Sequence, residues 1–183
     1  MAIPWQHIRK VTSRGAMTGN NPIDRSKLGT KRHILTDKNG IPLSVVISSA
    51  STHDIKLVTN VMDNMIIKRS SSSSSKCNSS RKRKLQHLCL DKAYSSKTVR
   101  QAIIKRGYVP HIPCKRNRGQ KIEVVCQKKH PSAKNKRWVV ERTNSWHNRF
   151  RKLHTRYEKK AENYLGLVQF SCCIIIYKKI ILG

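Results

Sequence analysis

Two carboxylates, Asp91 and Glu141, occupy positions at which an acid can take part in catalysis. Asp91 follows the apolar run 85–90, which is typical of a buried strand, and acids at such strand ends commonly belong to active sites in α/β sheets. Glu141 is the single acid in the basic stretch 134–153. For this stretch alone, an ion pair with the surrounding cations is the simpler interpretation, and a metal-binding carboxylate is the alternative.

The stretch 134–153 predicts one continuous amphipathic helix. Read at 3.6 residues per turn, one face carries the apolar residues Val139, Trp146, Phe150 and Leu153. The opposite face is basic and polar, with Glu141 at its centre among Lys134, Arg137, Ser145, Asn148 and Lys152. A carboxylate on such a surface would lie next to groups that can hold phosphate.

The composition is strongly basic. The 183 residues include 39 Lys and Arg but 9 Asp and Glu, which gives a net charge of +30. Such an excess on a chain long enough for one domain with a core favours a polyanion, and nucleic acid fits better than an acidic membrane surface. The cations expected to be exposed and to contact DNA are Arg25, Lys27, Lys31, Arg32, Lys134, Arg137, Arg149 and Lys152.

No membrane attachment is expected. The first ten residues lack the apolar core of a signal peptide, and the apolar run 165–177 has 13 residues, too few to span a bilayer. The six cysteines show no paired spacing, so the sequence indicates reduced thiols in a cytoplasmic protein and not a zinc site.

The elements that must position the two acids alternate between strands and helices. A strand hairpin is predicted around 37–40, with Asp37 as a turn former. The remaining predicted elements, in chain order, are a helix over 55–68, a strand over 85–90, a helix over 95–106, an edge strand over 108–113, a basic loop over 115–136, the helix over 134–153 and a last helix over 162–177. Asp54 precedes the first helix either as its N-cap, the preferred interpretation, or as a polar group near an active site.

This order predicts an α/β fold with a single sheet flanked by helices. Residues 1–30 are expected to form a basic N-terminal remnant and loop, and residues 31–183 the domain itself. Within that domain, the segment 70–84, rich in Ser, Lys and Arg, is an expected surface insertion.

Three blocks of the sequence resemble the catalytic domain of bacterial insertion-sequence DDE transposases, in the group with the IS4-like domain. They are NPIDRSKLGTKRHILTDKNGIPLSVVISSASTHD, LCLDKAY and RWVVERTNSWHNRFRKLHTRYEKKAENYLGLV, and the similarity covers roughly 19–177. The resemblance implies an RNase H-like mixed sheet flanked by helices and metal-dependent cutting and joining of double-stranded DNA. In that family three carboxylates hold two Mg²⁺ ions, or Mn²⁺. Asp91 matches the second carboxylate, Glu141 the third, and Arg137 the arginine that accompanies it.

The sequence departs from the family's pattern at several positions. The family's first catalytic Asp lies on the first strand, yet no Asp or Glu precedes Asp24 here. Ala93 replaces the usual glycine after the second Asp, and Asn148 stands where a Lys is common. We therefore expect an N-terminally truncated transposase with a missing or incomplete first strand, inactive alone. It would act in the bacterial cytoplasm, at the nucleoid when bound to DNA, as a homodimer or with a complementing upstream reading-frame product.

Two other interpretations fit the charge. One is a basic DNA-binding remnant without catalysis, and the other is a structural RNA-binding protein. The RNA-binding interpretation explains the net charge of +30 but not the placement of Asp91 and Glu141.

Overall fold

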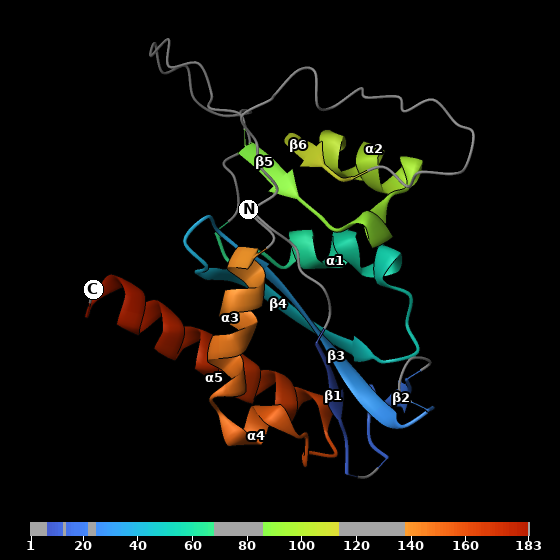
Figure 1. The fold of residues 1–183 in the computed structure, drawn as a ribbon, viewed down its shortest axis with the longest axis vertical. Coiled ribbons are helices and arrows are strands. Elements are labelled where there is room, and N and C mark those ends of the chain that lie inside the picture. The colour runs from blue at the N-terminus through green and yellow to red at the C-terminus, as the bar shows by residue number, and fades with distance from the viewer. Residues whose placement is uncertain (1–6, 13, 22–24, 68–85, 114–137, 183) are drawn as a thin grey trace.

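The computed structural model describes residues 7–12, 14–21, 25–67, 86–113 and 138–182 (Figure 1). The serine-rich insertion at 70–84 and the basic loop at 115–136 lie outside the described residues. Two of the expected DNA-contacting residues, Lys134 and Arg137, also lie outside them.

Strand β3 (Leu28–Thr36) is the centre of a four-stranded sheet. It pairs antiparallel with β4 (Pro42–Ser49), with Lys31 opposite Ser48 and Arg32 opposite Ile47. Strand β1 (His7–Lys10) and the short β2 (Gly19–Asn20) also pair antiparallel with β3. Residues 1–30, expected as a basic N-terminal remnant and loop, thus contribute β1, β2 and the start of β3 to this sheet.

The β3–β4 hairpin forms where the sequence predicted it. The Asp37 carboxylate accepts hydrogen bonds from the backbone N–H groups of Asn39, at 2.8 Å, and Ile41, at 2.7 Å. Gly40 has a φ of 88°, a conformation that L side chains rarely adopt. Asp37 is thus a turn former, as predicted.

Strands β5 (Gln86–Cys89) and β6 (Tyr108–His111) form a parallel pair joined through helix α2 (Lys97–Lys105). Gly107, with a φ of 77°, ends the connection from α2. Pro110 lies within β6, which pairs only with β5 among the described strands, so the predicted edge position is confirmed. The described residues show no pairing between β5–β6 and the four-stranded sheet, which differs from the single sheet expected.

Helices cover both faces of the four-stranded sheet (Figure 1). On one face, here named the α1 face, lie the 3₁₀ turn η1 (Asp54–Leu57) and α1 (Val58–Asp63), shorter together than the helix predicted over 55–68. The core on this side continues through α2, β5 and β6 and includes Leu35, Val58, Val61, Leu88, Leu90, Tyr94 and Ile103. On the other face, the α5 face, α3 (Trp138–Asn148), α4 (Arg151–His154) and α5 (Ala161–Ile180) pack over Ile47, Leu153, Tyr164 and Val168.

The expected continuous helix over 134–153 is wrong. Helix α3 ends at Asn148, the chain turns through Arg149 and Phe150, and α4 begins at Arg151. The residues that α3 buries are Val139, Val140, Thr143, Asn144 and His147. Glu141 lies on the exposed side, as the pattern predicted. In the described part of the chain, no helix is long and apolar enough to cross a membrane.

Candidate active site

Asp91 lies directly after β5, at the carboxyl end of the parallel pair. Asp91 is only 6% exposed, and its backbone carbonyl accepts a hydrogen bond of 3.1 Å from the Tyr94 N–H. This bond forms the 3₁₀ turn η2 (Lys92–Tyr94), which packs against η1. Because η1 begins with Asp54, the packing brings a second acidic segment to the end of β5.

The Tyr94 hydroxyl lies in the electrostatic field of both acids. Burial is the main cause that raises the pKa of Tyr94, and the negative charges of Asp54 and Asp91 raise it further. An effect of both carboxylates on one phenol requires that both lie near it. The neighbourhood of Asp91 therefore includes Asp54, which agrees with the alternative interpretation of Asp54 as a polar group near an active site.

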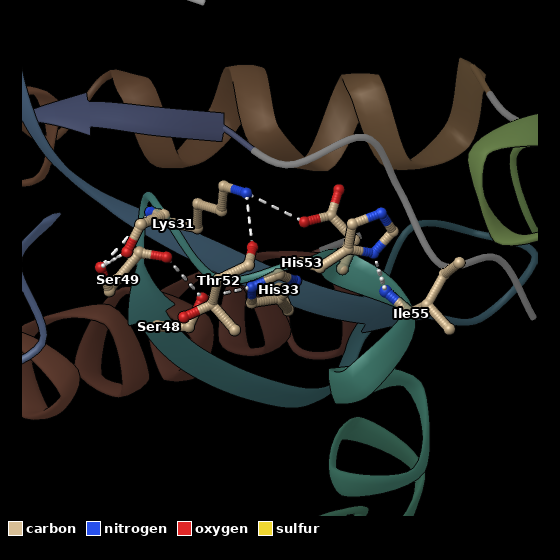
Figure 2. A network of polar contacts seen from close by, with 9 residues as sticks. Lys31, His33, Ser48, Ser49, Thr52, His53 and Ile55 are labelled. Carbon is tan, nitrogen blue, oxygen red and sulfur yellow. Dashed lines mark hydrogen bonds and ion pairs between the residues drawn. The ribbon is translucent and has the colours of Figure 1, made fainter. Parts of the chain in front are cut away.

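Asp54 is held by an ion pair to Lys31 of β3 (Figure 2). The Lys31 Nζ lies 3.0 Å from the Asp54 Oδ1 and donates a second hydrogen bond of 2.8 Å to the Thr52 carbonyl. The two side chains are 9% and 24% exposed. The preferred interpretation of Asp54 as an N-cap is wrong, because the Nδ1 of His53 accepts the Ile55 N–H at 3.4 Å and caps the turn.

Glu141 is exposed in the first turn of α3. The β3–β4 hairpin fixes the position of this helix. Thr143 Oγ1 donates a hydrogen bond of 2.7 Å to the Gly40 carbonyl, and the Arg142 guanidinium donates one to the Asn39 carbonyl. A Cβ at Gly40 would lie 2.9 Å from Thr143 Oγ1, so the helix and the hairpin approach each other too closely for a side chain there.

The predicted DNA-contacting cations fall into three groups. Arg25 and Lys27, in the turn before β3, are exposed, as are Arg149 and Lys152. Lys134 and Arg137 lie outside the described residues. Lys31 and Arg32 are buried, so the expectation that they are exposed is wrong. Side chains alternate along β3, so Lys31 and Arg32 point to opposite faces of the sheet, and helices cover both faces. The sequence of this segment alone did not reveal that both faces are covered.

Arg32 is fully buried on the α5 face, next to Arg9 of β1. Arg32 Nη2 donates a hydrogen bond of 3.1 Å to Asn148 Oδ1, and Arg9 donates to the same oxygen. Burial lowers the pKa of Arg32 to about 10, Tyr164 acts in the opposite direction, and the charge of Arg9 lowers it further. Asn148 is thus the acceptor for two guanidinium groups, and a Lys at this position would add a third cation.

The donor chemistry of the two predicted acids suits a hard cation, because Mg²⁺ and Mn²⁺ prefer carboxylate oxygens. Asp91 and Glu141 come from separate elements, the end of β5 and the first turn of α3. Among the residues that the structure describes, no three His, Cys, Asp or Glu side chains are grouped closely enough to hold a metal ion. These residues therefore fit the metal by ligand type but do not form a complete site.

A comparison with protein families decides what this chain is related to. The family model described as Transposase DDE domain matches residues 3–176, nearly the whole chain. The chain belongs to the DDE transposase family. A relative from Burkholderia cepacia, named "Putative transposase for insertion sequence element IS402", is 31% identical over 163 residues, which are 87% of this chain and 68% of the relative. The resemblance to insertion-sequence DDE transposases is confirmed by both matches, and no solved structure matches this transposase chain.

Proposed function

We propose that this transposase-family chain carries part of a metal-dependent site for cleaving and joining DNA strands, with Asp91 and Glu141 as its acids. The observation that carries the proposal is the buried carboxylate of Asp91 at the carboxyl end of a parallel strand pair, within a domain that the family model covers. A carboxylate at the end of a strand in an α/β sheet commonly belongs to an active site, which favours a functional role for Asp91.

The strand arrangement supports an RNase H-like fold as part of the proposal. Strands β1, β3 and β4 form antiparallel neighbours, and β5 and β6 follow as a parallel pair joined by a helix. Antiparallel and parallel pairs in one domain, with helices on both sides, fit the mixed sheet flanked by helices that the resemblance implies.

Mg²⁺ or Mn²⁺ would be held by Asp91 and Glu141, and a bound metal supplies charge stabilisation for phosphoryl transfer. The residues of this chain contribute by placement. The Asp54–Lys31 pair ties η1 to β3, and η1 in turn packs against η2, which follows Asp91. The hairpin contact of Thr143 fixes the helix that carries Glu141. Both acids thus lie on elements that are anchored by contacts distant in sequence.

Double-stranded DNA is the proposed partner. The net charge of +30 and the exposed cations Arg25, Lys27, Arg149 and Lys152 provide phosphate contacts independent of sequence. Affinity for DNA should then fall steeply with salt, with a logarithmic slope of about −0.9 for each neutralised phosphate. Binding that hardly changes between low and moderate salt contradicts this.

We further propose that the 183-residue chain does not complete strand transfer alone, because no Asp or Glu precedes Asp24 to provide a third acid from β1. The test is strand cleavage and joining on DNA that carries the ends of its insertion sequence, with Mg²⁺ or Mn²⁺. Without the third acid, the nucleophile and the leaving group are not activated together, and the rate of strand transfer should fall by roughly several orders of magnitude. We expect no joining by the chain, and joining when a homologous β1 segment with an Asp is supplied.

Asp91→Asn and Glu141→Gln should each abolish the restored joining, whereas Lys152→Ala should weaken DNA binding but leave metal-dependent joining at saturating protein. Joining by the unsupplemented chain would show that the site is complete without the added acid. If the restored activity is insensitive to Asp91→Asn, the assignment of the acids is wrong. A basic DNA-binding protein without catalysis is the second candidate, favoured by the absence of a three-ligand group in the described residues.

A further inference from the structure

Helices α3 and α5 form a groove outside the candidate active site. Its volume is about 300 Å³, at the lower end of the range for sites that bind small ligands. In Figure 1, α5 crosses α3 and continues past it to the C-terminus. The groove is lined by Trp146, Arg149, Phe150, Ile174, Ile175, Lys178 and Lys179.

The lining combines flat apolar surface with positive charge. Trp146 and Phe150 are half-buried aromatics, and Ile174 and Ile175 form the apolar wall from α5. Three of the lining residues are cations, and none of the lining residues that the structure describes is an acid. A ligand that fits this combination has a planar apolar part and negative charges next to it.

The two tryptophan rings of α3, Trp138 and Trp146, already contact cations. The Arg142 guanidinium carbon lies 4.8 Å from the Trp138 ring centroid and 5.1 Å from that of Trp146. The Lys179 Nζ lies 5.1 Å from the Trp146 ring centroid. Because Lys179 is exposed, its cation–π contact is weak and its long side chain can leave the ring when a stronger stacking partner arrives.

We propose that this groove binds one unpaired nucleotide of a DNA strand, with the base against Trp146 and Phe150 and the adjoining phosphates at Arg149, Lys178 and Lys179. Aromatic side chains stack on bases of any identity, and a basic rim follows the phosphates beside them. This inference rests on the proposed DNA-binding function and adds a place where a strand is held without its complement.

Charge disfavours a second copy of the chain as the occupant. Each copy carries a net charge of +30, and a docked copy would bring that charge against three cations at the rim. Duplex DNA supplies the right charge, but its stacked and paired bases cannot enter a groove of this size. An unpaired nucleotide offers both the charge and the free ring face.

The test compares the full chain's affinity for a short fluorescent oligothymidine strand with that for an abasic strand that has the same number of phosphates. Titrations by fluorescence anisotropy in EDTA separate binding from any metal-dependent chemistry. We expect the thymidine strand to bind about tenfold tighter, as one stacked base contributes. Equal binding of the two strands overturns the proposal, and this result is independent of whether Asp91 and Glu141 are catalytic.

Two matched pairs of variants locate the effect. Trp146→Leu should reduce the preference for bases to less than about twofold, whereas Trp138→Leu, at an exposed tryptophan of the same helix outside the groove, should keep it. Lys178→Ala with Lys179→Ala should weaken binding of both strands about tenfold more than Lys159→Ala with Lys160→Ala, which removes the same charge at the start of α5.

The lysine variants keep the test decisive if Trp146→Leu does not fold, because both lysines are exposed. Equal effects of the two lysine pairs show that only total charge matters and overturn the proposal. A dimer in sedimentation that the Lys178 and Lys179 changes abolish shows that a second copy occupies the groove, and likewise overturns it.

Discussion

Lys31 and Arg32 are neighbours on β3 but have opposite surroundings. Lys31 points to the α1 face, where it meets the carboxylate of Asp54 and the Thr52 carbonyl. Arg32 points to the α5 face, where it shares one amide oxygen of Asn148 with Arg9. Its Nε and Nη1 atoms are buried without a hydrogen-bond partner among the described residues.

The difference shows how the two faces are used. Burying a cation is tolerated on the α1 face because an acid neutralises it, and that acid lies next to the segment that carries Asp91. On the α5 face, Arg9 and Arg32 donate to the neutral amide oxygen of Asn148 and form no ion pair within the described residues, so their burial adds cost to the fold without a matching charge. Both faces carry apolar cores, but the α1 face pairs its buried lysine with an acid, and the α5 face buries Arg32 beside a neutral amide.

The largest expected effect comes from removing the compensating acid. Asp54→Asn leaves the Lys31 ammonium buried without its counter-charge, and we expect a loss of about 2–4 kcal/mol in the free energy of unfolding. Asp63→Asn is the matched control, because Asp63 forms an exposed ion pair of 2.8 Å with Arg106 and should cost less than about 1 kcal/mol. Urea denaturation of both variants measures the contrast, and equal losses would falsify the compensation argument.

A second contrast concerns two buried histidines. Burial, followed by the charge of Lys31, lowers the pKa of His33 to about 4 from 6.5. Burial, followed by the charges of Arg32 and Arg9, lowers that of His147 to about 3 from 6.5. Each ring also forms a hydrogen bond with a buried hydroxyl, His33 with Ser48 Oγ at 2.9 Å and His147 with Ser171 Oγ at 2.6 Å.

Because the folded pKa values are depressed, the stability that these neutral histidines contribute is complete above pH 6.5. It is lost as the pH falls from 6.5 through the folded values of about 4 and 3. Each histidine should lose up to about 1.4 kcal/mol per pH unit in this window. Denaturation at several pH values should show that His33→Gln and His147→Gln each flatten the slope. Variants that keep the full wild-type slope would assign it to other groups.

The smallest effect is expected on the uncompensated side. Arg32→Met removes a buried guanidinium that lacks an acidic partner, so stability should stay within about 1 kcal/mol of the wild type or rise. Lys31→Met is the control one residue away and should destabilise, because it leaves Asp54 without its cation. The same denaturation experiment measures this effect. If Arg32→Met lowers the free energy of unfolding by more than about 2 kcal/mol, the hydrogen bond of Arg32 to Asn148 stabilises the fold by more than burial of its charge destabilises it.

Local chemistry explains what the sequence predicted correctly. The hairpin depends on Asp37 and Gly40, which lie within one turn, and the end of α2 depends on Gly107. The position of Asp91 depends on the short apolar run before it, which forms β5. Each signal is carried by residues close together in the chain.

What the sequence did not predict depends on contacts between distant residues. The burial of Arg32 and the end of α3 at Asn148 are set by an interaction across 116 positions, between β3 and the helix terminus. The pairing of Lys31 with Asp54 likewise requires that η1 fold back onto β3. Neither the charge pattern nor the periodicity of a single segment contains this information.

The contact between Thr143 and Gly40 has a consequence for how this family can vary. It joins residues 103 positions apart, so the helix that carries Glu141 is held against a hairpin near the start of the chain. Lengthening a loop between two anchored points costs only about 0.6 kcal/mol for each doubling. A change in chain length between β6 and α3 should therefore leave Glu141 in place, because the contact of Thr143 with Gly40 anchors α3.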